Sequence, residues 1–204
     1  MTEDVKGVAK ASRGTAPPVV AEEGWEPVQP LRIEGGRGSF VSGDPRGDTL
    51  RLAYFRRAAR PGEGNDRLVG RAWFGPGSQG PPGHAHGGAM AAVLDECMGA
   101  AAWMTGLAVV AAHIEVDFEN MLPLGTDAWF EAWVESVDGR KVDCRARVYA
   151  RGEDGTEHPL ARSTGLFLTL PMERFRELLD QVARSMETTP EELRREMKRR
   201  GWKG

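Results

Sequence analysis

Two neighbouring carboxylates, Asp95 and Glu96, interrupt an otherwise apolar, alanine-rich stretch, GAMAAVLDECMGAAAWM, over residues 88–104. An unpaired charge is costly to bury, so carboxylates in such a stretch lie at a rim or take part in chemistry. The stretch has the length and composition of a helix, on which adjacent side chains point about 100° apart. The two carboxylates therefore cannot serve one site in the same way.

The chain enters this helix through His86-Gly87-Gly88. Neither glycine has a side chain that blocks the first-turn N–H groups, and the helix dipole adds partial positive charge there. Such an end can polarise a carbonyl or hold an oxyanion. Asp95 shares a face with Gly88 but lies about 10 Å further along the axis, too far for both to act on one carbonyl carbon. Antiparallel packing of two copies would bring them together, so the spacing predicts an obligate dimer with composite sites.

The remaining elements are predicted from alternation of apolar and polar residues. Two strands, from Leu50 and from Arg67, precede the helix, and four alternating stretches follow it: VVAAHIEVDFE, TDAWFEAWVESV, RKVDCRARVYA and PLARSTGLFLTL. Period-2 alternation predicts one core face and one wet face per strand, as in an antiparallel sheet. In the first stretch the apolar set is Ala112, Ile114, Val116 and Phe118. We expect two strands, a helix buried on all sides, and then a four-strand meander.

Composition narrows the function classes. The chain has 204 residues, 40% of them hydrophobic, and a formal charge of −3, which fits one sizeable soluble core. No apolar run approaches the roughly 20 residues that cross a bilayer, and MTEDVKGVAK lacks the apolar block of a signal peptide. Near-neutral charge gives no global field for nucleic acid. We expect a cytoplasmic protein that binds neither membrane nor nucleic acid.

Three regions are expected along the chain. Residues 1–24 are small, charged and proline-containing, which predicts a flexible segment. Residues 25–170 hold the strands and the central helix. Residues 171–204 change to a helical period, with Thr189 as an N-cap and Pro190 at the first helical position of the last helix. This last region is expected to be a peripheral helical extension.

The order of these motifs resembles a known family. The runs GPPGHAHGGAMAAVLDECMGAAAWM, VVAAHIEVDFENMLPLG, VESVDGRKVDCRARV and ARSTGLFLTL look like the hotdog-fold acyl-CoA thioesterases of the phenylacetate-pathway (PaaI-like) branch. FVSGDPRGDTLRLAYF resembles the strand entry of mitochondrial-type relatives. The resemblance covers about residues 40–170. It implies an α+β hotdog fold, in which a curved antiparallel sheet wraps around one central helix, and edge-to-edge dimers that often form tetramers.

The resemblance also implies an activity and its residues. Asp95 would act as general base or nucleophile on an acyl thioester bound by the other protomer, and the N–H of Gly88 or of its neighbour Gly87 would polarise the carbonyl. His86 would line the same mouth. No cofactor and no metal are implied; His84 and His86 have the two-residue spacing of some metal sites, but no third ligand is evident nearby.

Coenzyme A would, by the same resemblance, lie along a series of surface residues: Asp117, Glu119, Trp129, Phe130, Asp138, Arg140 and Lys141. Arg140 and Lys141 suit phosphates by charge. The two carboxylates Asp117 and Glu119 suit them less well, so a different acyl carrier stays open. Many relatives also have a serine or threonine where this chain has Ala111, and His113 is a possible substitute.

Two further function classes stay open. A non-catalytic acyl-thioester binding or sensor module would keep the cavity without the hydroxyl that Ala111 lacks. A hotdog hydratase or dehydratase would need a histidine on the central helix, and residues 88–104 contain none. The leading hypothesis is thioester hydrolysis, with Glu96 in a structural role.

Overall fold

The computed structural model describes residues 16–28, 39–42, 44, 46–185 and 188–199. Their elements are, in chain order, β1 (Trp25–Pro27), β2 (Leu50–Arg57), β3 (Arg67–Phe74), the short 3-10 helix η1 (Pro76–Ser78), α1 (Gly87–Met104), β4 (Val109–Phe118), β5 (Asp127–Asp138), β6 (Lys141–Arg151), β7 (Glu157–Thr169), α2 (Met172–Ser185) and α3 (Pro190–Arg199). Every predicted strand and helix is present within a few residues of its expected bounds.

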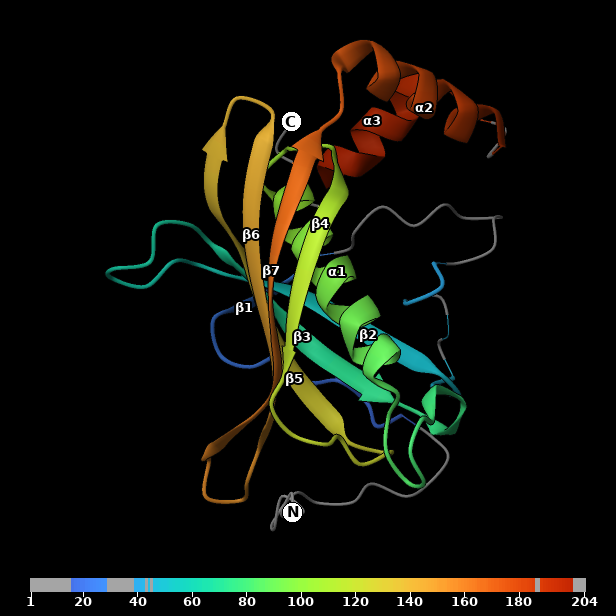
Figure 1. Ribbon diagram of the computed structural model, residues 1–204. Coiled ribbons are helices and arrows are strands. Elements are labelled where there is room, and N and C mark those ends of the chain that lie inside the picture. The colour runs from blue at the N-terminus through green and yellow to red at the C-terminus, as the bar shows by residue number, and fades with distance from the viewer. Residues whose placement is uncertain (1–15, 29–38, 43, 45, 186–187, 200–204) are drawn as a thin grey trace.

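The strands form one antiparallel sheet in the order β1-β2-β3-β5-β6-β7-β4, curved beside α1 (Figure 1). This order corrects the expected four-strand meander. Only β5, β6 and β7 follow one another, because β4 pairs with β7 at one edge and β5 pairs with β3 in the middle. Residues 119–126 carry the chain from β4 at the edge of the sheet to β5 in its middle, where the three-strand meander begins. The helix α1 comes before β4 and connects β3 to it.

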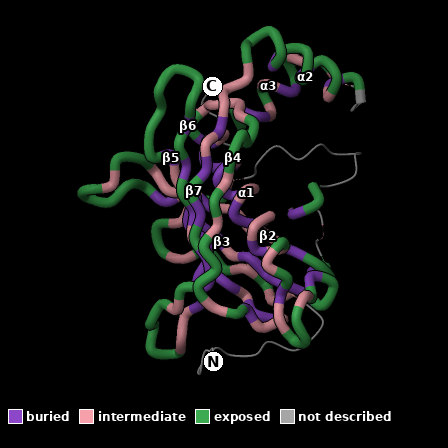
Figure 2. Tube along the Cα trace, viewed as in Figure 1, coloured by how far each residue is buried: buried purple, intermediate pink, exposed green. Residues whose placement is uncertain are grey.

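The core lies between α1 and the concave side of the sheet. Val93, Leu94, Cys97 and Met98 of α1 are fully buried. They pack in one cluster with inward side chains of the sheet, among them Val142, Cys144, Ala146 and Val148. The expectation of burial on all sides is wrong for α1. Its side turned away from the sheet is only partly covered, at Ala92, Asp95, Glu96, Gly99 and Trp103 (Figure 2).

Strand β4 is an exposed edge whose alternation is interrupted. A register shift lies between Ala111, which pairs with Phe167, and His113, which pairs with Leu166. Phe167 is buried in the core, so Ala111 lies on the inward side of the sheet. His113, opposite the outward Leu166, lies on the other side. The uniform alternation expected for this strand fails at Ala112, because an extra residue in a bulge exchanges the two faces.

The C-terminal helices build a second, smaller core. Phe175, Leu179, Leu193 and Met197 pack together against Trp103 at the end of α1. The predicted cap of α3 is confirmed, since the Glu192 N–H donates to Thr189 Oγ1 at 3.2 Å and the Thr189 N–H donates to a Glu192 carboxylate oxygen at 3.1 Å. No helix among the described residues is long and apolar enough to cross a membrane.

The described part of the N-terminal segment lies against the sheet side that faces away from α1. Arg51 donates to the Pro17 carbonyl. Glu22 accepts from Trp129 Nε1 at 2.6 Å and from Arg151 Nη1 at 2.8 Å. The division at residues 24 and 170 stays a prediction, and residues 1–15 of the expected flexible segment lie outside the described residues.

Candidate functional site

The N-terminal end of α1 presents one backbone donor. His86 is the N-cap, and its Nδ1 accepts the Gly88 N–H at 2.8 Å. An accepting Nδ1 carries no proton, so this contact assigns the neutral imidazole with its proton on Nε2. The Gly87 N–H has no hydrogen-bond acceptor among the described residues. Of the two glycines expected to polarise a carbonyl, only Gly87 therefore has its N–H free for a ligand in this state of the chain.

The loop before α1 is held in place by backbone hydrogen bonds. The His86 N–H donates to the Ser78 carbonyl at 2.7 Å, and the Ala85 N–H donates to the Leu122 carbonyl at 2.8 Å. Gly80 passes so close that a Cβ there would lie 2.7 Å from His86 Cα. Because such an approach excludes any side chain, the glycine-rich loop serves to bring the backbone tightly around His86.

Asp95 lies on the partly covered side of α1 without a counter-charge. Its Oδ1 is buried and has no hydrogen-bond partner among the described residues. Burial raises the pKa of this carboxyl above its usual range. A half-buried carboxylate with a raised pKa and a vacant acceptor atom has the properties of a general base. Eight residues of helix separate it from Gly87, about 12 Å along the axis, so the two cannot share a substrate atom within one chain.

Glu96 differs from its neighbour because hydroxyl groups surround it. Glu96 Oε1 accepts from Tyr54 Oη at 3.3 Å, from Ser42 Oγ at 3.2 Å and from Ser39 Oγ at 3.4 Å. Burial, together with Cys97 and Glu96, raises the pKa of the Tyr54 hydroxyl. These contacts tie α1 to β2 and to the loop before it. The structural role expected for Glu96 is consistent with them.

The residues expected along coenzyme A fall into three separate places. Asp117 and Glu119 lie where β4 ends, and both pair with Arg162, at 3.0 and 3.5 Å. The hairpin of Asp138, Arg140 and Lys141 lies at the opposite end of the sheet. On the common neighbour β7, Lys141 pairs with Leu168 and Asp117 pairs with Arg162. Six residues of strand separate these positions, about 20 Å.

Trp129 and Phe130 lie in a third place, in the middle of the sheet. The Arg71 guanidinium stacks 3.5 Å from the Trp129 ring centroid, on the side away from α1. Phe130 is 1% exposed and belongs to the core. A single chain therefore brings together His86 and Gly87 with one another, and Asp117 with Glu119, but not all the expected binding residues.

Two residues near the start of α1 were not singled out from the sequence. Arg162 neutralises Asp117 and Glu119, and its outward position on β7 follows from the strand's alternation. Phe118, at the end of β4, is 53% exposed and lies against Gly87, where a Cβ would be 3.4 Å from the ring. Its position follows from the sheet order, which the sequence pattern did not predict.

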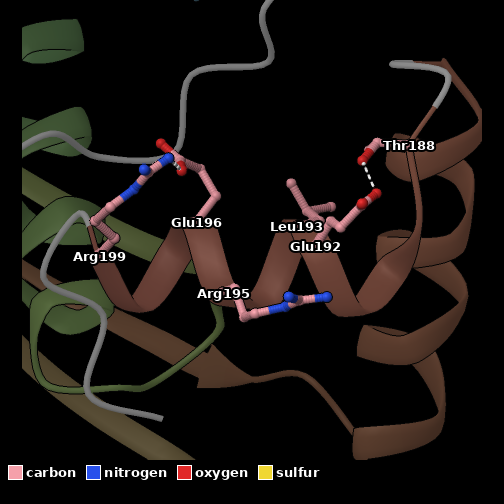
Figure 3. A pocket seen from close by; sticks show the side chains of 6 residues that line it. All are labelled: Thr188, Glu192, Leu193, Arg195, Glu196 and Arg199. Atoms are coloured by element: carbon pink, nitrogen blue, oxygen red, sulfur yellow. Dashed lines mark hydrogen bonds and ion pairs between the residues drawn. The ribbon is translucent and has the colours of Figure 1, made fainter.

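Two hollows on the described surface lie away from α1 or only at its edge. The larger, about 480 Å³, lies on α3 and is lined by Thr188, Glu192, Leu193, Arg195, Glu196 and Arg199 (Figure 3). Its polar side chains pair along the helix, Glu192 with Thr188 and Arg199 with Glu196. The second, about 370 Å³, includes Glu119 and Arg162. No group of three or more histidine, cysteine, aspartate and glutamate side chains that could hold a metal ion occurs in the described part of the chain.

Comparison with known families and curated proteins gives one consistent result. Residues 82–156 match the family model of the thioesterase superfamily. Acyl-coenzyme A thioesterase THEM4 of Xenopus laevis is 37% identical over 98 residues, 47% of this chain and 42% of that protein. Acyl-coenzyme A thioesterase THEM5 of Mus musculus is 31% identical over 99 residues, 48% of this chain and 39% of that protein. The chain thus spans about two fifths of the length of these relatives.

One solved structure shows the same fold. The crystal structure of a protein described as a thioesterase superfamily protein has a TM-score of 0.52 and 26% identity, covering 74% of this chain and 68% of that one. The PaaI protein of E. coli has a TM-score of 0.47 and 15% identity, covering 60% of this chain and 80% of that one. The expected hotdog arrangement, a curved antiparallel sheet beside one central helix, is confirmed.

Proposed function

We propose that this chain, a member of the thioesterase superfamily, hydrolyses an acyl thioester to a free acid and a thiol. In the proposed reaction, Asp95 of one protomer takes a proton from a water molecule that attacks the carbonyl carbon. Alternatively, Asp95 attacks this carbon itself, and water then hydrolyses the resulting mixed anhydride to free acid. The carbonyl oxygen accepts a hydrogen bond from the Gly87 N–H of the other protomer. The developing oxyanion is stabilised by that N–H and by the helix dipole, and the thiolate leaves.

The observation that carries the proposal is that the proposed base and the proposed donor both lack a hydrogen-bond partner among the described residues. Asp95 Oδ1 is buried with no partner among the described residues, and the Gly87 N–H has no acceptor there. Buried polar atoms are normally satisfied within a fold. A base without a partner and a donor without an acceptor, both on one helix, are what a bound thioester and a water molecule would complete.

The edge strand β4 supports a composite site. One side of β4 pairs with β7, and the other side has no strand partner among the described residues. An edge of ten residues is a template for pairing with a second copy. Antiparallel pairing of β4 with its copy extends the sheet across a twofold axis. It also lays the two α1 helices side by side in opposite directions, so the start of one faces the middle of the other.

Coenzyme A is the thiol carrier that we propose. The curated relatives are named acyl-coenzyme A thioesterases. Asp117 and Glu119 would repel phosphates, but Arg162 pairs with both, which removes much of that repulsion. In a dimer joined through β4, the end of one β4 lies near the start of the other. The hairpin of Arg140 and Lys141 therefore approaches Asp117 of the partner, and the residues that one chain keeps apart become neighbours.

The test is release of free thiol from short, medium, long and aryl acyl-CoA thioesters, followed by mixing of two inactive variants. Asp95→Asn removes the base, and Gly87→Val blocks the donor. After joint unfolding and refolding, half of the dimers combine both variants, and each of these has one intact composite site. We expect about a quarter of the wild-type rate in the mixture. No recovery, with mixed dimers present, would contradict the shared site.

A sensor function is the second candidate, favoured by Ala111. This residue lies on the inward side of β4 opposite Phe167, where a hydroxyl could orient water and a methyl group cannot. A module that binds acyl thioesters without cleaving them would show saturable binding across the panel and no thiol release. Turnover that is lost in Asp95→Asn would exclude this alternative.

A further inference from the structure

The ring of Phe118 lies beside Gly87, the first residue of α1. A Cβ built on Gly87 would be 3.4, 3.5 and 3.8 Å from three atoms of this ring. Phe118 pairs with the buried Ala161, so its side chain is on the inward side of the sheet. It is nevertheless 53% exposed. The far end of an aromatic ring thus lies beside the first residue of the helix, while much of the ring is open to solvent.

Backbone hydrogen bonds hold the end of β4 next to the start of α1. The loop after β4 is hydrogen-bonded to the loop before α1, through the Ala85 N–H to the Leu122 carbonyl at 2.8 Å and the Leu124 N–H to the Gly83 carbonyl at 3.0 Å. A bridge between His84 and Pro123 adds to this contact. The end of β4 therefore cannot move away from the helix start without breaking these hydrogen bonds. The backbone that carries Phe118 is therefore held close to the start of α1.

The absence of a side chain at Gly87 leaves a narrow slot beside this ring. His86 closes the side of the next residue, because its Nδ1 accepts the Gly88 N–H. An oxygen that accepts from the Gly87 N–H would then have the imidazole and the phenyl ring as neighbours. A flat group suits such a slot, since aromatic faces pack well against planar groups.

We propose that Phe118 forms a wall of the carbonyl slot, contacts the planar thioester of the substrate and excludes water from its hydrogen bond to the Gly87 N–H. This inference rests on the proposed function and adds a substrate-contacting residue to it. A hydrogen bond to a carbonyl gains strength when water is kept from it. Because every substrate has the same thioester group, the contribution of Phe118 is independent of the length of the acyl chain.

The experiment compares Phe118→Ala and Phe118→Leu with wild type on a short and a long acyl-CoA. Met172→Ala is the matched control, because Met172 is 61% exposed on α2, away from the slot. We expect Phe118→Ala to lower kcat/KM about tenfold for both substrates, as for the loss of one aromatic contact. Phe118→Leu should lie in between, and Met172→Ala should match wild type. Thermal unfolding and light scattering check that all variants are folded dimers.

A ketone analogue of an acyl-CoA, with a methylene group in place of the sulfur, separates this proposal from the proposed function. It keeps the carbonyl but is not cleaved, so its binding is measured by calorimetry whether or not the enzyme turns over. Weaker binding by Phe118→Ala supports the wall even if wild type releases no thiol. Unchanged kinetics and binding, a loss for only one chain length, or a loss that follows dissociation of the dimer would overturn it.

Discussion

The two sides of the molecule treat buried carboxylates differently. On the sheet side that faces away from α1, Asp127 accepts from Arg51 at 3.1 Å and from Arg71 at 2.7 Å. Asp95, on the partly covered side of α1, has no counter-charge and a buried Oδ1 without a partner among the described residues. Burial raises the pKa of both carboxyls, but only Asp127 has arginines that oppose the shift.

The difference distinguishes carboxylates that form ion pairs between strands, such as Asp127, from Asp95, which forms none among the described residues. Arginines pair with the buried carboxylates on the outer side; Glu131, for instance, pairs with Arg57 at 2.6 Å and with Arg147 at 2.9 Å. Such a network is consistent with cohesion between strands. A lone carboxylate destabilises the fold and persists where it has another use. The predictions below test whether the two sides can be told apart by activity and by stability.

The largest effect is expected for Asp95→Asn. Removal of a general base lowers kcat by about a thousandfold, within the range for such groups. Glu96→Gln is the matched control on the next residue, and it should keep most of the activity because it leaves Asp95 unchanged. Thiol release at equal folded concentration measures both. Equal losses of activity in the two variants would contradict the assignment of Asp95 as the base and of Glu96 as a structural residue.

On the outer side, Asp127→Ala should lower stability instead. The substitution leaves the buried guanidinium groups of Arg51 and Arg71 without their carboxylate, and breaking a buried pair costs about 3 kcal/mol. Urea unfolding would measure the change in the free energy of unfolding. The specific activity of the folded fraction should stay near that of wild type. A loss of activity at full folding would show that this network serves the site.

The pH dependence should also distinguish the two sides. Because burial raises the pKa of Asp95, this base becomes protonated at a higher pH than an ordinary carboxylate. As the pH is lowered, kcat/KM should therefore begin to fall above the ordinary carboxyl range and then drop about tenfold per pH unit. The folded-state pKa exceeds the unfolded one, so the ionised carboxylate costs stability above the folded pKa and nothing below the unfolded pKa. Asp95→Asn should therefore raise the melting temperature at pH 7 but not at pH 3. A higher melting temperature at pH 3 only would reverse the assigned sign.

Residue patterns predicted the elements better than their arrangement. The alternation of Val142, Cys144, Ala146 and Val148 matches a buried face in the structure, because that strand lies inside the sheet with neighbours on both sides. The order of the strands depends on pairing between strands that are far apart in the sequence. Local periodicity holds no information on such pairing. The bulge at Ala112 was not predicted for the same reason, because a bulge is defined by the register of β4 against β7.

The sequence named candidate site residues, whose roles stay predictions, but it did not give their contacts. Asp95, Gly87 and His86 were recognisable from their types and spacing. That His86 takes the Gly88 N–H, and that Phe118 covers Gly87, depends on a rotamer and on a long-range contact. The arrangement of Arg162 between two carboxylates likewise needs the pairing of β4 with β7. Sequence spacing identified the chemical groups, and tertiary packing decided which of them are left available.

His86 gives a smaller effect that tests the donor end of α1. His86→Ala removes the acceptor of the Gly88 N–H and costs about 1 kcal/mol of cap stability, or about fivefold in kcat if that cap positions Gly87. His86→Asn supplies another side-chain acceptor at the N-cap and should recover most of the rate. Rescue by asparagine with an unchanged KM indicates a positioning role. Equal activity losses in the two variants would instead mean that the imidazole itself touches the substrate.

The smallest effect is expected from adding a group that this chain lacks. Ala111 lies on the inward side of β4 opposite Phe167, and Phe167 also approaches Gly99, one helical turn beyond Asp95. A hydroxyl at residue 111 is thus directed toward the side of α1 that presents Asp95, where it can accept a hydrogen bond from the attacking water and orient it. Ala111→Ser should raise kcat about threefold, as for one modest hydrogen bond. Ala112→Ser, at the bulged residue that has no partner on β7, is the control that should change nothing. A gain that persists in the Asp95→Asn background would show that the added hydroxyl acts independently of the carboxylate, and the asymmetry between the two sides of the molecule would then not explain the activity.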